Sequence, residues 1–119
     1  MSGPGLILAS QSESRRRMLA AAGIPHRALR SPLDEEEEKA RLRDDSVPIG
    51  AEMALKLAQA KACAVAGADD DLVLGCDQLL VTDDGTMLDK ADSLATLALQ
   101  LRALSGRTHV LHSAAAIVQ

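Results

Sequence analysis

The sequence lacks aromatic residues entirely: its 119 residues include no Trp, Tyr or Phe. The core must therefore be built from Leu, Ile, Val, Ala and Met. This absence argues against stacking of nucleic-acid bases on aromatic rings and against an aromatic belt at a membrane interface. A formal net charge of −4 gives no general attraction for nucleic acid or anionic membranes. We expect neither as a partner, and any anionic ligand must meet a local cluster of positive charge.

Cysteines and long apolar runs are also scarce. Cys63 and Cys76 form no C-x-x-C pair, so a zinc site is not expected. Reduced thiols are typical of a cytoplasmic protein, which is the location that we expect. The first apolar run, residues 6–9, is too short for the hydrophobic segment of a signal peptide or for a transmembrane helix.

The remaining composition is that of one globular domain, with 47% hydrophobic and 25% charged residues. Apolar runs predict strands at residues 6–9, 72–74 with an extension over 79–82, and 108–118. A second short strand could lie at 27–30, and 86–88 is the returning strand of a hairpin. Helical signals predict three helices: one from a capping box at Ser10 and Glu13 to about residue 22, one from 46 to 67, and one from Asp92 or Ser93 to Gly106. This order predicts an α/β domain with a mixed β-sheet flanked by helices.

Three local expectations complete this outline. The spacing of the last helix places Leu94, Leu97, Ala98, Leu101 and Leu104 on one face. The charged stretch 34–45 reads as a solvated loop or helix edge, and turns are expected at 69–71 and 83–85. The chain ends inside an apolar, strand-like run at 110–118, which suggests a C-terminally truncated domain. We expect its open edge to favour self-association, for example as a homodimer, or to lower stability.

The segment after the first strand is the first candidate for chemistry. A strand leading into a helix N-terminus presents free backbone N–H groups to an anion. Ser12 adds a hydroxyl donor, and Arg15 adds a guanidinium fork that matches phosphate oxygens. The alternative is an ordinary helix cap followed by a solvated basic face. Glu13 argues against phosphate because its charge would repel it.

Further candidates are a carboxylate and two lysines. Asp77 stands at the polar end of an apolar strand, where a general base, a metal ligand or a simple turn residue is expected. Lys61 borders the apolar stripe of its helix, from which it could also reach solvent, and Lys90 follows the hairpin. The acidic run 34–38 could hold a divalent cation or form a solvated face. The sequence contains no Walker A, G-x-G-x-x-G or H-E-x-x-H motif.

Taken together, several segments in this order resemble the Maf family of nucleoside triphosphate pyrophosphatases. They are residues 6–12, 15–16 with Leu19, 22–25, 34–35, 57–62, 75–78, 88–90 and 104–109. The resemblance implies a fold like that of inosine triphosphatases. It also implies a house-cleaning hydrolase that converts a nucleoside triphosphate into the monophosphate and pyrophosphate.

The resemblance also implies roles for individual residues. Asp77 corresponds to the family's proton acceptor, and Glu35 to an acidic position that could help to hold Mg or Mn. The phosphate-contacting positions correspond to Ser12, Arg15, Lys61 and Lys90.

This chain departs from the family pattern in several places. Glu13 replaces a frequent proline, Ser14 an arginine of one subgroup, and Ala91 the proline that usually follows Lys90. Gln78 and the S-x-x-R-R pattern look more like the 7-methyl-GTP subgroup than the dTTP/UTP subgroup. Family members are longer, and this chain corresponds to about their first three-fifths. A non-catalytic nucleotide- or phosphate-binding protein, or an interaction module, is therefore the alternative function.

Overall fold

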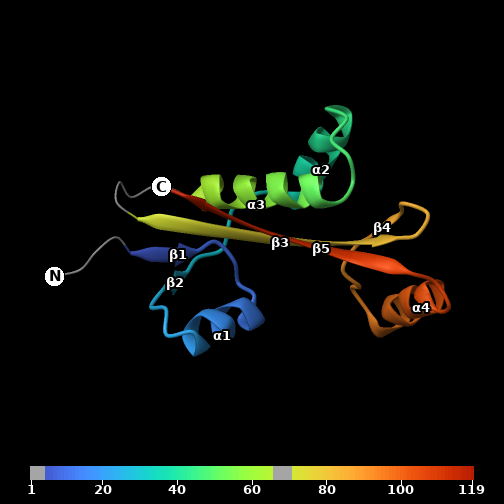
Figure 1. The fold of residues 1–119 in the computed structure, drawn as a ribbon, viewed down its shortest axis with the longest axis horizontal. Coiled ribbons are helices and arrows are strands. Elements are labelled where there is room, and N and C mark those ends of the chain that lie inside the picture. Colours follow the sequence, from blue (N-terminus) through green and yellow to red (C-terminus); the bar gives the residue numbers. More distant parts are fainter. Residues whose placement is uncertain (1–4, 66–70) are drawn as a thin grey trace.

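The computed structural model describes residues 5–65 and 71–119. The chain folds as an α/β domain with one five-stranded mixed sheet, which confirms the predicted fold class (Figure 1). The elements are β1 (Leu6–Leu8), α1 (Glu13–Ala21), β2 (Arg27–Ala28), α2 (Glu35–Asp44), α3 (Ala51–Val65), β3 (Leu72–Thr82), β4 (Met87–Leu88), α4 (Leu94–Leu104) and β5 (His109–Val118). The predicted helix end at Gly67 and most of the predicted turn at 69–71 lie outside the described residues.

The long strand β3 organises the sheet. Along one edge, β5 pairs with it antiparallel from Val73 to Thr82. Along the other edge, β1 pairs with it in parallel up to Leu74, and β4 pairs with it antiparallel from Leu80 onward. β2 extends the sheet beyond β1, again in parallel. Within the described residues, no strand covers this second edge of β3 between Leu74 and Leu80, which leaves an opening in the sheet there.

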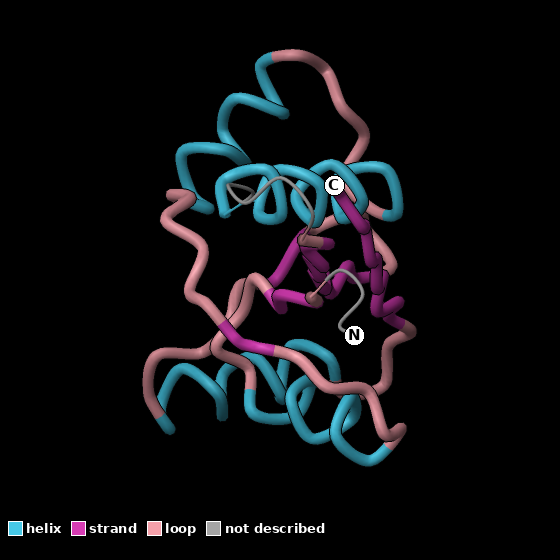
Figure 2. Tube along the Cα trace, turned by 90° about the vertical axis from the view of Figure 1, so that its left-hand side faces the viewer, coloured by secondary structure: helices cyan, strands magenta, loops and turns pink. Residues whose placement is uncertain are grey.

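Helices lie on both faces of the sheet. In Figure 1, α2 and α3 lie on one side of it and α1 and α4 on the other; Figure 2 shows the strands between these two helical layers. The well-packed core lies under α3, whose buried residues are Met53, Ala54, Leu57, Ala58 and Ala62. The small side chains let α3 approach β3 closely, and at Gly75 even a Cβ atom would collide with the α3 backbone.

The opposite face of the sheet is much more open, and the apolar face of α4 is largely exposed there. No residue of α4 is buried, and Leu94 and Leu101 are 84% and 59% exposed. The periodicity correctly identified an apolar face, but periodicity does not reveal how much protein is present to cover it. Leu97, Leu101 and Leu104 instead line one wall of a cleft.

Local signals also misplaced several boundaries. Ser12, not Ser10, is the N-cap of α1, and its Oγ accepts a hydrogen bond from the Arg15 N–H. The acidic run forms the regular helix α2, because Asp34 caps it and acidic residues in the first turn interact favourably with the helix dipole. The next helix begins at Ala51 rather than near residue 46.

The strand lengths also differ from those predicted. β3 runs without a break through Gly75, whereas β2 and β4 are only two residues each. The predicted hairpin turn at 83–85 is confirmed, because β3 and β4 pair on either side of it. Among the described residues, no helix is long and apolar enough to cross a membrane.

Candidate active site

The opening in the sheet between β1 and β4 is the place where the candidate residues meet. The carboxyl ends of the parallel strands β1 and β2 face this opening, and ligands of open α/β sheets bind at such ends. A cleft of about 620 Å³ lies here. It is lined by all six residues singled out from the sequence: Ser12, Arg15, Glu35, Lys61, Asp77 and Lys90.

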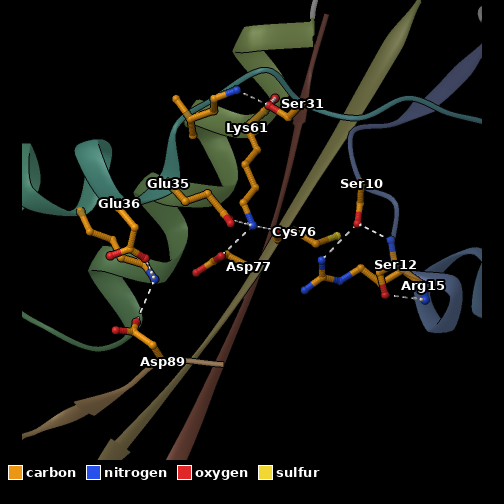
Figure 3. A network of polar contacts seen from close by, with 12 residues as sticks. Ser10, Ser12, Arg15, Ser31, Glu35, Glu36, Lys61, Cys76, Asp77 and Asp89 are labelled. Carbon is orange, nitrogen blue, oxygen red and sulfur yellow. Dashed lines mark hydrogen bonds and ion pairs between the residues drawn. The ribbon is translucent and has the colours of Figure 1, made fainter. Parts of the chain in front are cut away.

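Asp77 is the buried acidic group of the cleft, with 5% of its surface exposed. Its Oδ1 accepts a hydrogen bond of 2.8 Å from Lys61 Nζ, which also forms an ion pair with Glu35 (Figure 3). Its Oδ2 is buried and has no hydrogen-bond partner among the described residues. Because an unpartnered buried carboxylate oxygen is costly, this atom marks where a water or a cation fits best.

Lys61 points into the site rather than out to solvent. Only 13% of its side chain is exposed, and its Nζ also donates a hydrogen bond of 3.2 Å to the carbonyl oxygen of Cys76. The close packing of α3 on β3 brings the ammonium group to this position. Of the two orientations that the sequence left open for Lys61, the structure shows the inward one.

The start of α1 forms a second, positively charged part of the cleft. Ser10 Oγ accepts hydrogen bonds from the Ser12 N–H at 3.0 Å and from Arg15 Nη1 at 3.4 Å, which holds the guanidinium over the helix N-terminus (Figure 3). Glu13 pairs with Arg17 at 2.9 Å. Its carboxylate therefore has a partner of opposite charge on the helix surface, which reduces the repulsion of phosphate expected from the sequence.

Lys90 is carried by a loop that two helices hold in place. The neighbouring Asp89 accepts a hydrogen bond of 3.2 Å from Lys39 of α2, and its backbone carbonyl accepts one of 2.6 Å from Gln100 of α4. Burial lowers the pKa of Lys39, but hydrogen bonds and charges from Asp89 and Glu36 outweigh it, so the pKa lies above its usual value. Sequence reasoning missed Lys39 and Gln100, because both look like ordinary solvated helix residues.

The other end of the cleft is apolar. Gln78 lies next to Asp77 on β3 but points to the opposite sheet face, because side chains alternate along a strand. Its Nε2 donates a hydrogen bond of 3.2 Å to Ser113 Oγ on β5. Beyond it, the wall consists of leucines: Leu79, Leu80, Leu88, Leu97, Leu101, Leu104 and Leu111. The cleft thus combines a cationic end with an apolar wall, which suits a ligand that carries phosphates on an organic group.

The carboxylates in this cleft are the side chains that could bind a metal ion. Within the described ranges, no group of three or more His, Cys, Asp or Glu side chains is arranged to bind a metal ion. Glu35 and Asp77 nevertheless share Lys61 as a partner, and Asp77 Oδ2 still lacks one. Two carboxylates suit Mg²⁺, which usually takes one or two from the protein and the rest from water and phosphates.

Comparison with known proteins identifies the family. A family profile described as Maf-like protein matches residues 5–119. The chain belongs to the Maf family. The family resemblance seen in the sequence is therefore confirmed, and the cleft described above is the candidate active site of a Maf chain.

The similar curated proteins include pyrophosphatases with three different names. A nucleoside triphosphate pyrophosphatase of Nitrobacter hamburgensis is 44% identical over 115 residues, which cover 96% of this chain and 55% of the relative. A dTTP/UTP pyrophosphatase of Moorella thermoacetica is 44% identical with the same coverage. A 7-methyl-GTP pyrophosphatase of Mesorhizobium japonicum is 43% identical over 118 residues, which cover 96% of this chain and 57% of the relative. The chain spans about half the length of these relatives.

Proposed function

We propose that this chain belongs to an enzyme that hydrolyses a nucleoside triphosphate between its α- and β-phosphates, releasing the monophosphate and pyrophosphate. The observation that carries the proposal is the buried Asp77, whose Oδ2 is free of partners in the described structure and lies in a cleft with cations at one end. The names of the relatives support the same reaction.

Asp77 is the proposed general base. Lys61 holds Oδ1 at 2.8 Å, which leaves Oδ2 to accept the proton of a water that attacks the α-phosphorus. The same Lys61 keeps the carboxylate oriented, since the side chain can turn only by breaking that ion pair. Water that loses its proton to Oδ2 forms the new P–O bond, while the bond to the pyrophosphate breaks.

The cations of the cleft are proposed to stabilise the charge that develops on the phosphates. Arg15 offers a fork-shaped guanidinium at the α1 N-terminus, and Ser12 offers a hydroxyl. Lys61 and Lys90 add two ammonium groups on the other side of the opening. Fixed positive groups of this kind act mainly on the transition state, where the leaving pyrophosphate gains charge.

A divalent cation, Mg or Mn, fits this site in part. Glu35 is the protein side chain that would hold it, with phosphate oxygens and water completing its coordination. Bound there, the ion would neutralise phosphate charge. A cation on Glu35 would compete with the ion pair that Glu35 forms with Lys61.

Gln78 and the S-x-x-R-R pattern support a preference for 7-methyl-GTP over dTTP and UTP. Gln78 lines the cleft and donates a hydrogen bond to Ser113, and its amide is proposed to contact the base. The sequence identities of 44% and 43% to relatives of both kinds do not distinguish them.

The deciding experiment is Asp77→Asn, assayed by separating the products of hydrolysis. We expect turnover to fall roughly 100-fold or more, the usual size of a general-base effect, while nucleotide binding persists. Asp44→Asn, on the exposed surface of α2, is the matched control and should keep full activity. Unchanged turnover in Asp77→Asn, or release of orthophosphate with a diphosphate, would contradict the proposal. Nucleotide binding without turnover in the unaltered protein would favour the binding-protein alternative.

A further inference from the structure

A second cavity of about 460 Å³ adjoins the cleft. The two hollows share Glu35, Lys61 and Lys90, so these residues stand at their common boundary. The rest of the second cavity is built from the segments that follow β1 and β2. These residues are Ala9, Ser10, Gln11, Arg30, Ser31 and Leu33.

Arg30 reaches this cavity because β2 ends beside β1. The Leu29 N–H donates a hydrogen bond of 2.9 Å to the Leu8 carbonyl, which continues the pairing of the two strands by one residue. The residues that follow, Ser10 and Arg30, therefore leave the sheet at the same edge. Among the described residues, Arg30 has no hydrogen bond or ion pair, whereas Arg27 pairs with Asp71 at 3.2 Å.

The charge of the second cavity favours an anion. Its lining carries three cations, Arg30, Lys61 and Lys90, against one carboxylate, Glu35, which already pairs with Lys61. This local excess stands in a chain whose formal net charge is −4. Unlike the neighbouring cleft, the cavity has little apolar surface, since Ala9 and Leu33 are its only apolar side chains. It fits a compact polyanion better than an organic group.

We propose that this cavity receives the terminal phosphates of the substrate and that Arg30 is a phosphate-binding residue. The inference rests on the proposed function and adds the orientation of the bound nucleotide. The nucleoside occupies the leucine-lined cleft, Lys61 and Lys90 lie where the cleft and the cavity join, and the leaving pyrophosphate occupies the cationic cavity. Arg30 can then grip two phosphate oxygens at once, which a lysine at this position would not do.

Inorganic pyrophosphate is the probe for a direct test. Its affinity is measured by titration calorimetry for the unaltered protein and for Arg30→Gln, Arg30→Lys, Lys90→Gln and Arg43→Gln. We expect Arg30→Gln to weaken pyrophosphate binding roughly tenfold, as for loss of one charge-assisted contact, and Arg30→Lys to recover part of it. Nucleoside monophosphate affinity should stay unchanged in Arg30→Gln. Arg43→Gln, with the same charge change on the exposed face of α2, should bind pyrophosphate normally.

The variants separate failure of this inference from failure of the proposed function. Normal pyrophosphate binding in Arg30→Gln, together with weakened binding in Lys90→Gln, would overturn the role of Arg30 and leave the proposed reaction intact. Normal binding in both would count against the proposed reaction as well. An equal loss in Arg43→Gln, or an equal loss of monophosphate affinity in Arg30→Gln, would overturn the assignment of the cavity to pyrophosphate.

Discussion

Replacing Gly75 by alanine tests the contact on which the whole site depends. A Cβ atom at this position would collide with the Ala58 carbonyl oxygen and would lie only 2.9 Å from the Ala62 nitrogen and 3.0 Å from the Ala62 Cβ. Two of these three atoms belong to the backbone of α3, so no side chain can rotate to make room. The helix itself must therefore move away from β3, by on the order of 1 Å.

The expected cost follows from that movement. Overpacking of this kind destabilises a protein by about 1–3 kcal/mol, or roughly 4–12 °C in melting temperature for a domain of this size. Lys61 moves with α3 and away from Asp77, with which it now forms a 2.8 Å hydrogen bond. A misplacement of about 1 Å at a catalytic pair can reduce kcat/KM roughly 100-fold.

Thermal unfolding followed by circular dichroism measures the first effect, and the hydrolysis assay measures the second. Gly5→Ala is the matched control, because its added Cβ would meet only the end of the flexible Asp71 side chain, at 3.0 Å. We expect this control to melt within a few degrees of the unaltered protein. If Gly75→Ala melts equally high, α3 does not pack on β3 as closely as described.

Two further predictions concern the loop and the substrate. Lys39→Met removes one of the two contacts that hold Asp89 and thereby loosens the neighbouring Lys90. We expect steady-state kinetics to show a several-fold rise in KM with little change in kcat. Lys39→Arg should restore KM, and the exposed Lys56→Met is a neutral control. Because Asp89 is 58% exposed and water screens the pair, we expect the ion pair to contribute about 1 kcal/mol or less, and a large fall in melting temperature would contradict the positioning role. Side-by-side assays should show faster turnover of 7-methyl-GTP than of dTTP or UTP, and a reversed order would remove Gln78 as the basis for substrate choice.

Most of the fold was predictable because its signals are local. Apolar runs located β1, β3 and β5, and the Asp-Asp-Gly turn located the hairpin between β3 and β4. The errors arose where two local signals competed or where the outcome depended on distant residues. Ser10 and Ser12 are both good caps; in the structure Ser12 caps α1, whereas Ser10 Oγ accepts the Ser12 N–H. The exposure of α4 depends on what packs against it, which its own sequence does not contain.

The candidate site divides in the same way. The family resemblance brought together the six residues that line the cleft, although they come from distant parts of the chain. Two residues near these six were missed. Lys39 lies 50 residues from Asp89, and Arg30 resembles any exposed arginine until β2 is placed beside β1. Composition and spacing do not reveal such neighbours, because these residues come together only when the chain has folded.

The position of Asp77 in the middle of β3 has a consequence for the timing of events in the cleft. β5 pairs with β3 along the whole region around this residue, so we expect the backbone there to open more slowly in hydrogen exchange than the loops. Arg30 and Lys90 belong to loops, where opening is faster. The proposed base thus lies on a paired strand, whereas two of the cations proposed to hold the phosphates, Arg30 and Lys90, lie on loops. In the proposed reaction, we therefore expect nucleotide entry and pyrophosphate departure to depend on movement of these loops and to require no rearrangement of the sheet.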